Sequence, residues 1–205
     1  INAGNVQLTT ASTIQGDTTV SNSAFISIIQ QGSATASLSN LTFNGAATGI
    51  GAALSLTPTS SNNTNVALVN CGTLTLNGTN TISLAAVNVG TLALVKYTGA
   101  LAGSGNITNL SLPQGATGFV SNSVANSTLY AVITSAGPGL TWTGTNSTAL
   151  NVWNINNTTN WLVGAVPTSY HQIIVPGDAV SFTDTGSGTV ILNTTPYTIA
   201  GIAAE

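Results

Sequence analysis

The sequence predicts an all-β protein, and three observations lead to that prediction. Good helix formers such as Glu, Lys, Arg and Met are nearly missing, because the 205 residues include one lysine or arginine, four acidic residues and no methionine. Short alternating segments rich in threonine and valine lie between turn residues, as is typical of strands. Glycine, which disfavours helices, occurs 22 times. We therefore expect no helix longer than two turns.

The expected strands can be followed along the chain. Residues 33–39 alternate between polar and apolar side chains, and residues 74–76 do the same. The dipeptides Asn44-Gly45 and Asn77-Gly78 each follow such a segment and are strong turn signals. A later strand is expected at residues 179–183, after a Pro-Gly-Asp turn.

Internal repetition refines the fold class. The segment 41–45 (LTFNG) returns as 74–78 (LTLNG), and the looser pattern Gly-x-apolar-x-Leu occurs at 4–8, 72–76, 90–94 and 188–192. Repeated strands with small residues at the corners are typical of a β-solenoid, in which uncharged Asn and Thr side chains can stack in ladders. The prediction is a right-handed β-helix-like solenoid followed by a β module. The alternative is a β-sandwich that joins its neighbours by donor-strand exchange.

A domain boundary is expected at residues 135–139 (SAGPG). Residues 1–135 form one strand-rich unit, solenoid-like or sandwich-like, with few aromatic side chains. Residues 136–205 contain all three tryptophans and the only histidine, so they form a second β module or the start of the next repeat. The chain opens without the segments of a signal peptide, so we expect either a processed chain or part of a longer protein.

The near absence of charge excludes several functions. Charged residues make up 2% of the chain, against about 25% in an average soluble domain. Nucleic acids and anionic membrane surfaces are not expected as partners, because a single lysine cannot form a basic patch. Membrane insertion is not expected either, since the longest apolar stretch, residues 84–95, is interrupted by polar residues. Cys71 has no partner for a disulfide within the chain and is expected to be buried.

Four short segments of the second module carry a family resemblance. They are LTWTG at 140–144, VWN at 152–154, NW at 160–161 and PGDAVSFTD at 176–184. This series resembles the "WxG…WD…NW…GDxVxFxD" block of bacterial surface proteins with autotransporter-associated β-strand repeats. The resemblance implies a secreted, mainly β-helical passenger region that acts as an adhesin or surface layer.

Two further segments are similar to the same family, and one position departs from it. Residues 94–105 resemble its "LxxYTGxxxGsG" segment, and residues 1–8 resemble its "tInaGtLqL" segment. Asn154 stands where the family usually has Asp. The near-total loss of charge is also extreme for the family, which indicates a specialised structural member.

No catalytic or metal-binding group emerges from the sequence. His171 is the only candidate general base, with Asp178 seven residues further on, but no Gly-x-Ser-x-Gly nucleophile motif occurs. Asp178 and Asp184 flank a strand and would lie roughly 20 Å apart, too far for a paired-carboxylate mechanism. Calcium needs more carboxylates than these. We therefore predict no enzyme activity, no cofactor and no metal.

Three groups of side chains remain as candidates for packing, binding or modification. Trp142, Trp153 and Trp161 either pack in a core or form an aromatic platform for sugars. Lys96 either extends to solvent from an apolar strand or forms an isopeptide bond with an asparagine. Ten asparagines stand in Asn-x-Ser/Thr sequons and are candidate glycosylation sites: Asn40, Asn62, Asn77, Asn106, Asn109, Asn126, Asn146, Asn156, Asn157 and Asn193.

Together these features predict a structural protein, extracellular or at the cell surface, that forms a fibre, layer or adhesin stalk by uncharged strand-mediated self-association. Its expected partners are copies of itself, in a homopolymer or tandem repeats, and surface glycans. The alternative function is an adhesin module that binds a glycan or protein partner through the tryptophan region.

Overall fold

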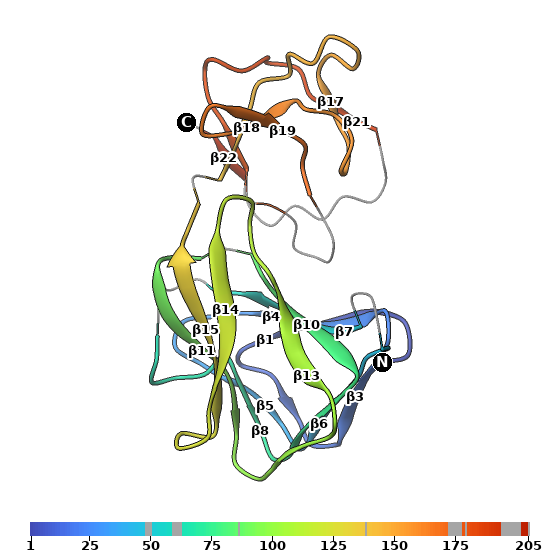
Figure 1. Cartoon of the computed structure of the whole chain (residues 1–205), viewed down its shortest axis with the longest axis vertical. Coiled ribbons are helices and arrows are strands. Elements are labelled where there is room, and N and C mark those ends of the chain that lie inside the picture. Colours follow the sequence, from blue (N-terminus) through green and yellow to red (C-terminus); the bar gives the residue numbers. More distant parts are fainter. Residues whose placement is uncertain are drawn as a thin grey trace.

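The computed structural model describes residues 1–47, 51–58, 63–85, 87–137, 139–171, 178, 180–193 and 202–204. This part of the chain is all-β, with strands β1 to β22 and no helix, so the predicted fold class is confirmed. None of it is a helix that could cross a membrane. Figure 1 shows β1 to β15 in the lower part of the molecule and the later strands above them.

Strands β1 to β13 belong to three sheets, which the chain visits in turn, so that every third strand falls in the same sheet. The first sheet contains β1 (Gly4–Thr9), β4 (Ala24–Ile29), β7 (Ala52–Thr57), β10 (Thr79–Leu84) and β13 (Asn106–Ser111). The second contains β2 (Thr13–Ile14), β5 (Ala36–Leu38), β8 (Val69–Cys71) and β11 (Gly90–Tyr97). The third contains β3 (Thr18–Ser21), β6 (Leu41–Asn44), β9 (Leu74–Asn77) and β12 (Leu101–Ala102). We call three consecutive strands, one from each sheet, a tier.

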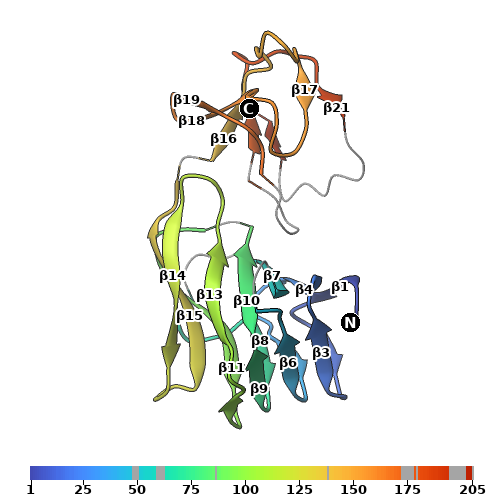
Figure 2. The same cartoon turned by 45° about the vertical axis from the view of Figure 1, so that its right-hand side comes forward.

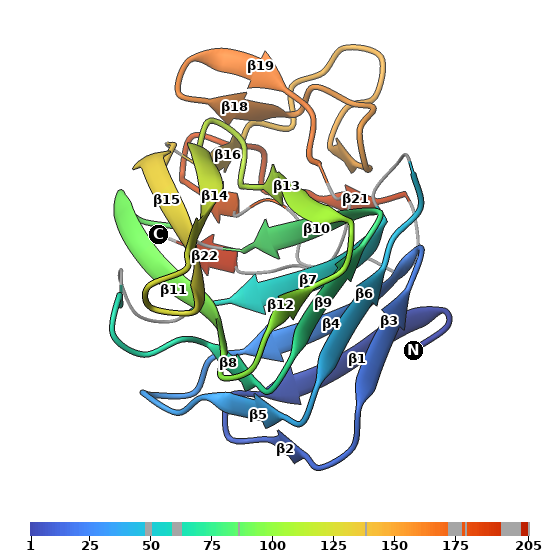
Figure 3. The same ribbon diagram turned by 60° about the horizontal axis from the view of Figure 1, so that its bottom comes forward.

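All pairings between successive tiers are parallel. Figures 2 and 3 show the result: β3, β6 and β9 lie side by side in one sheet, and β1, β4, β7 and β10 lie side by side in another. A hairpin of β14 (Thr117–Ser123) and β15 (Thr128–Ser135) then pairs antiparallel with β11 and extends the second sheet.

The first sheet stacks chemically similar residues. An aliphatic–Ser–aliphatic triplet recurs every 28 residues, at 26–28, 54–56, 82–84 and 110–112. The ladder pairs Ser27 with Ser55, Ser55 with Ser83 and Ser83 with Ser111. The aliphatic residues on either side of the buried serines enter one hydrophobic core that all three sheets share. This repeat thus supplies continuous aliphatic columns to the interior of residues 1–135.

The repeated LTFNG and LTLNG segments are neighbours in the third sheet. Leu41 pairs with Leu74 and Asn44 with Asn77, so the sequence repeat is also a structural one. The Asn77 amide donates to Asn44 Oδ1 at 2.7 Å, which forms an uncharged ladder at the corner. The looser Gly-x-apolar-x-Leu pattern is not a structural repeat, because its four copies fall on β1, β9, β11 and β21, which belong to four different sheets.

Two expected strands are shorter than the alternation indicated. The segment 33–39 forms a strand only at Ala36–Leu38, and the segment 179–183 only at Val180–Phe182. In both segments the flanking residues lie in turns or irregular backbone, or outside the described residues.

The chain after β15 forms separate sheets with a separate core. One sheet has the order β19 (Val166–Thr168), β18 (Trp161–Val163), β16 (Leu140–Trp142), β20 (Val180–Phe182) and β22 (Ile202–Ala204). A second sheet pairs β17 (Val152–Trp153) with β21 (Ile191–Leu192). The buried residues of this core begin at Leu140, whereas those of the first core end at Ile133.

Candidate functional site

The three tryptophans lie together in the centre of the second core. Trp142, Trp153 and Trp161 are 1%, 2% and 0% exposed. The ring of Trp161 stands edge-on to both others, with centroids 4.8 Å apart in each case, and Tyr170 and Phe182 pack around them. A sugar that stacks on an aromatic ring needs an open ring face, and these rings offer none. The cluster is therefore packing, and it holds β16, β17 and β18 together.

Two asparagines of the motif segments hold the backbone around this cluster. Asn160 is fully buried, and its amide donates to the carbonyl oxygens of Ala149 and Val152 at 2.7 and 2.8 Å. Asn154 Oδ1 accepts from both the backbone N–H and the hydroxyl of Thr158, each at 2.8 Å. Because both side chains satisfy buried backbone or hydroxyl groups, their role here is structural. Neither role needs a charge, which is consistent with Asn at position 154.

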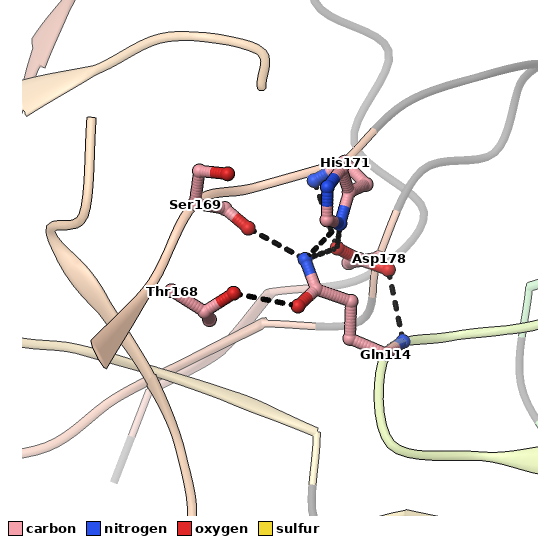
Figure 4. A network of polar contacts seen from close by, with 5 residues as sticks. All are labelled: Gln114, Thr168, Ser169, His171 and Asp178. Carbon is pink, nitrogen blue, oxygen red and sulfur yellow. Dashed lines mark hydrogen bonds and ion pairs between the residues drawn. The ribbon is translucent and has the colours of Figure 1, made fainter. Parts of the chain in front are cut away.

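A polar network joins the loop between β13 and β14 to the second core (Figure 4). Asp178 is buried, and its Oδ1 accepts from the backbone N–H of Gln114 at 3.0 Å. Its Oδ2 accepts from the Gln114 side-chain amide and from the backbone N–H of His171, each at 2.8 Å. Gln114 also accepts from the Thr168 hydroxyl and contacts the His171 ring through its amide nitrogen. The side chain of Gln114 thus has polar contacts with four residues near the second core: Thr168, Ser169, His171 and Asp178.

We call this network the polar joint, because it links the loop between β13 and β14 to residues 168–171 and Asp178. His171 Nδ1 and Asp178 Oδ2 are 3.9 Å apart, but the amide of Gln114 lies between them and also donates to the carbonyl oxygen of Ser169 at 2.5 Å. The one hydroxyl in the network, that of Thr168, donates to Gln114 Oε1 at 2.8 Å. In a catalytic arrangement the hydroxyl nucleophile would hydrogen-bond to the imidazole of the general base. The Thr168 hydroxyl bonds to Gln114 instead of to His171. What the arrangement does is connect two segments that are far apart in sequence.

Burial raises the pKa of Asp178 above its ordinary value, although the N–H donors of His171 and Gln114 act in the opposite direction. The folded chain therefore binds a proton at a higher pH than the unfolded chain does. Between those two pKa values the native state holds more protons, so the contribution of Asp178 to stability increases as the pH falls and is lost as the pH rises through the folded pKa.

The direction of this pH dependence can be tested by substituting Asp178. We expect the free energy of unfolding of the native protein, minus that of Asp178→Ala, to grow as the pH falls from 7 to about 4. Urea denaturation across this pH range measures the difference. The same comparison in a His171→Ala background assigns the trend to the carboxyl group. A difference that shrinks toward acid pH would contradict this account of the network.

The other titratable candidates lie apart from one another. Cys71 is buried in β8, and burial raises the pKa of its thiol to about 11, which keeps it protonated and unreactive. Asp184 is exposed, in the segment after β20. Within the described residues no three His, Cys, Asp or Glu side chains come together as a metal site would require. Lys96 is exposed on β11, and its ammonium group has no ion pair or hydrogen bond with any described residue.

The sequon asparagines divide into two groups by their surroundings. Six are exposed: Asn106, Asn109, Asn126, Asn156, Asn157 and Asn193. Three are half-buried, and their amide nitrogens, to which a glycan would be attached, donate hydrogen bonds instead: Asn40 to Asp17, Asn77 to Asn44 and Asn146 to Thr159. Asn62 lies outside the described residues. The exposed group therefore offers the better acceptor sites.

Comparisons of this chain with protein-family models, curated proteins and solved structures found no match. The resemblance of the tryptophan segments to autotransporter-associated repeats therefore rests on the motifs alone.

Sequence reasoning missed two features that the structure brings forward. Gln114 carries the joint, yet nothing in its neighbourhood distinguishes it from other polar residues of a loop. The 28-residue period of aliphatic–Ser–aliphatic triplets is visible in the printed sequence, and comparison at a fixed spacing would have found it.

Proposed function

We propose that this protein is a structural subunit, extracellular or at the cell surface, that forms a fibre, layer or adhesin stalk by stacking on copies of itself. The contacts are uncharged strand edges and apolar columns. The observation that carries the proposal is the first tier, where the apolar column ends at the exposed Val6 and where β1 and β2 have no further strand beside them among the described residues.

The finer fold assignment is part of this proposal: residues 1–135 form a β-solenoid, and residues 136–205 form a distinct β module. Three parallel sheets visited in turn, with columns of matching residues, support a solenoid. A Greek-key sandwich with donor-strand exchange would have mainly antiparallel neighbours. The two separate hydrophobic cores, with their limits at Ile133 and Leu140, support the division into two units.

The first tier has the properties of a stacking surface. Strands β1, β2 and β3 each stand at the end of their sheet, and no further strand pairs with them among the described residues. The outer edge of β3 is partly occupied, because the carbonyl oxygen of Ile1 accepts from the N–H of Ser21 at 2.9 Å and the amino group of Ile1 donates to the carbonyl oxygen of Thr19 at 2.6 Å. The more open edges are therefore those of β1 and β2. Unpaired strand edges of this kind readily recruit another strand. A copy that stacks here would extend the sheets that end at β1 and β2.

The interior column supports the same conclusion. Val6 pairs with Ile26, Ile26 with Leu54, and Leu54 with Ile82. The exposed fraction is at most 1% for the last three, but 38% for Val6. Val6 thus continues the column at its open end but is exposed, and a second copy would cover it. Burying apolar area contributes about 25 cal/mol per Å².

Composition favours assembly of this kind. With one cation and four acidic residues, copies repel one another only weakly. The single lysine also leaves one site for trypsin-like proteases, which suits a protein outside the cell. The motif resemblance to secreted surface proteins supports the same location.

A charge placed on the open end tests the proposal. Val6→Lys puts an ammonium group where the next copy would bury it, and an unpaired buried charge is strongly unfavourable. We expect sedimentation to find this variant as monomers at concentrations at which the native chain assembles.

The matched control is Val124→Lys, which adds the same charge to a side chain that is 78% exposed in the turn between β14 and β15. This variant should assemble like the native chain. Circular dichroism confirms that both variants fold. Normal assembly by a folded Val6→Lys protein would exclude the first tier as the contact surface.

A further inference from the structure

The only cation of the chain stands at a polar pocket on the outer face of the second sheet. A cavity of about 410 Å³ lies between three segments: the loop before β8, the strand β11, and the turn that leads into β15. Its polar lining includes Lys96, Asn65, Asn126 and Tyr130. Ligand sites in proteins have volumes of roughly 300 to 1,000 Å³, so the space suits a small ligand.

A β-bulge sets the orientation of Lys96. The pairing of β11 with β15 shifts between Ala93 and Val95, so Leu94 is the extra residue. Leu94 and Val95 are consequently both buried, and the strand returns to the surface with Lys96. Bulges of this kind often redirect a side chain next to a binding site.

Backbone hydrogen bonds fix the two walls of the pocket. On one side, the carbonyl oxygen of Asn63 accepts from the N–H of Ala93 at 2.8 Å, which attaches the loop to β11. On the other side, the N–H of Tyr97 donates to the carbonyl oxygen of Ser127 at 2.9 Å, and Ser127 has a left-handed backbone conformation with a φ of 49°. The pocket is therefore formed before any ligand arrives, which reduces the entropy lost on binding.

The polar groups in this pocket are available to a ligand. Within the described part of the chain, no hydrogen bond engages the Lys96 ammonium, the side-chain amides of Asn65 and Asn126, or the Tyr130 hydroxyl. Together they supply one positive charge and several neutral donors and acceptors. Three alanines, Ala67, Ala93 and Ala125, leave room among them.

From these groups we infer that the pocket binds a sugar that carries one carboxylate, such as a uronic acid residue of an acidic polysaccharide. One ammonium group matches one negative charge, while the amides and the phenol match ring hydroxyls, and the tyrosine ring offers an apolar surface. A phosphorylated ligand carries more negative charge than a single lysine neutralises. This site is separate from the buried tryptophans and does not depend on self-association.

Equilibrium dialysis of the full, unglycosylated chain with glucuronate, glucose and acetate tests the inference. The native chain should bind glucuronate more tightly than either of the other two. Lys96→Gln should weaken glucuronate binding at least about tenfold, because a hydrogen bond to a charged group is lost. Asn126→Ala should weaken the binding of glucuronate while leaving the charge in place.

Gln31→Glu is the control, since it changes the net charge by the same amount at an exposed position between β4 and β5, outside the first tier. Its affinity for glucuronate should equal that of the native chain. No saturable binding of glucuronate, or equal affinity in Lys96→Gln, would overturn the inference. Acetate bound as tightly as glucuronate would overturn the assignment to a sugar.

Discussion

Replacing Trp161 by alanine should lower the free energy of unfolding of the second core by about 3 to 5 kcal/mol. Trp161 is fully buried, and its ring contacts Trp142, Trp153 and Phe182, with centroid distances from 4.8 to 5.7 Å. Its indole Nε1 has no hydrogen-bond partner among the described residues, so ring packing accounts for its contribution. Removal leaves a large cavity at the centre of the cluster.

The measurement is urea denaturation followed by the fluorescence of the two remaining tryptophans, both of which belong to this core. Leu150→Ala is the control, because Leu150 is 61% exposed and its substitution should change stability by no more than about 0.5 kcal/mol. If the two variants unfolded at the same urea concentration, the tryptophan cluster would not be what holds this module together.

The second large effect is expected at a corner of the first unit. Gly78 follows Asn77 in the repeated turn and has a φ of 66°, which side chains other than glycine rarely adopt. A Cβ at this position would meet the carbonyl oxygens of Gly45, in the tier before, and of Ala46, the second at 2.8 Å. Backbone strain and overpacking together should make Gly78→Ala less stable by roughly 2 to 4 kcal/mol.

Gly16→Ala provides the matched comparison, because a Cβ there meets nothing within 4 Å. Its stability should be unchanged or slightly higher, since alanine restricts the unfolded chain. Chemical denaturation followed by far-ultraviolet circular dichroism measures both variants. Equal stability of Gly78→Ala and Gly16→Ala would mean that successive tiers do not pack closely at this corner.

The all-β class could be predicted because composition determines it. Few helix formers, abundant Thr and Val, and frequent turn residues all favour strands. The LTFNG and LTLNG repeat could also be interpreted correctly from the sequence, because its two copies form the neighbouring strands β6 and β9 in register. Strand lengths were less predictable, because alternation continues into turns whose backbone leaves the sheet.

The polar joint could not be predicted, because long-range contacts create it. Gln114 and Asp178 are 64 residues apart, and neither belongs to a motif that pairs them. The pocket at Lys96 has the same origin, since its walls come from three separate segments. The sequence identifies Lys96 as the only lysine or arginine. The fold alone places the amides of Asn65 and Asn126 and the phenol of Tyr130 around the same pocket.

Sedimentation of the native chain across a range of salt and pH tests the central claim most directly. Raising the salt from about 0.1 M to about 1 M reduces the Debye length from roughly 10 Å to roughly 3 Å and so removes most attraction between charges. If uncharged strand edges and apolar columns hold the assembly, particle size should not fall at high salt, nor at a pH that protonates Asp17, Asp178, Asp184 and Glu205. Dissociation into monomers by salt, by mild acid or by a chelator would show that ionic or metal contacts hold the copies together, and would contradict the account.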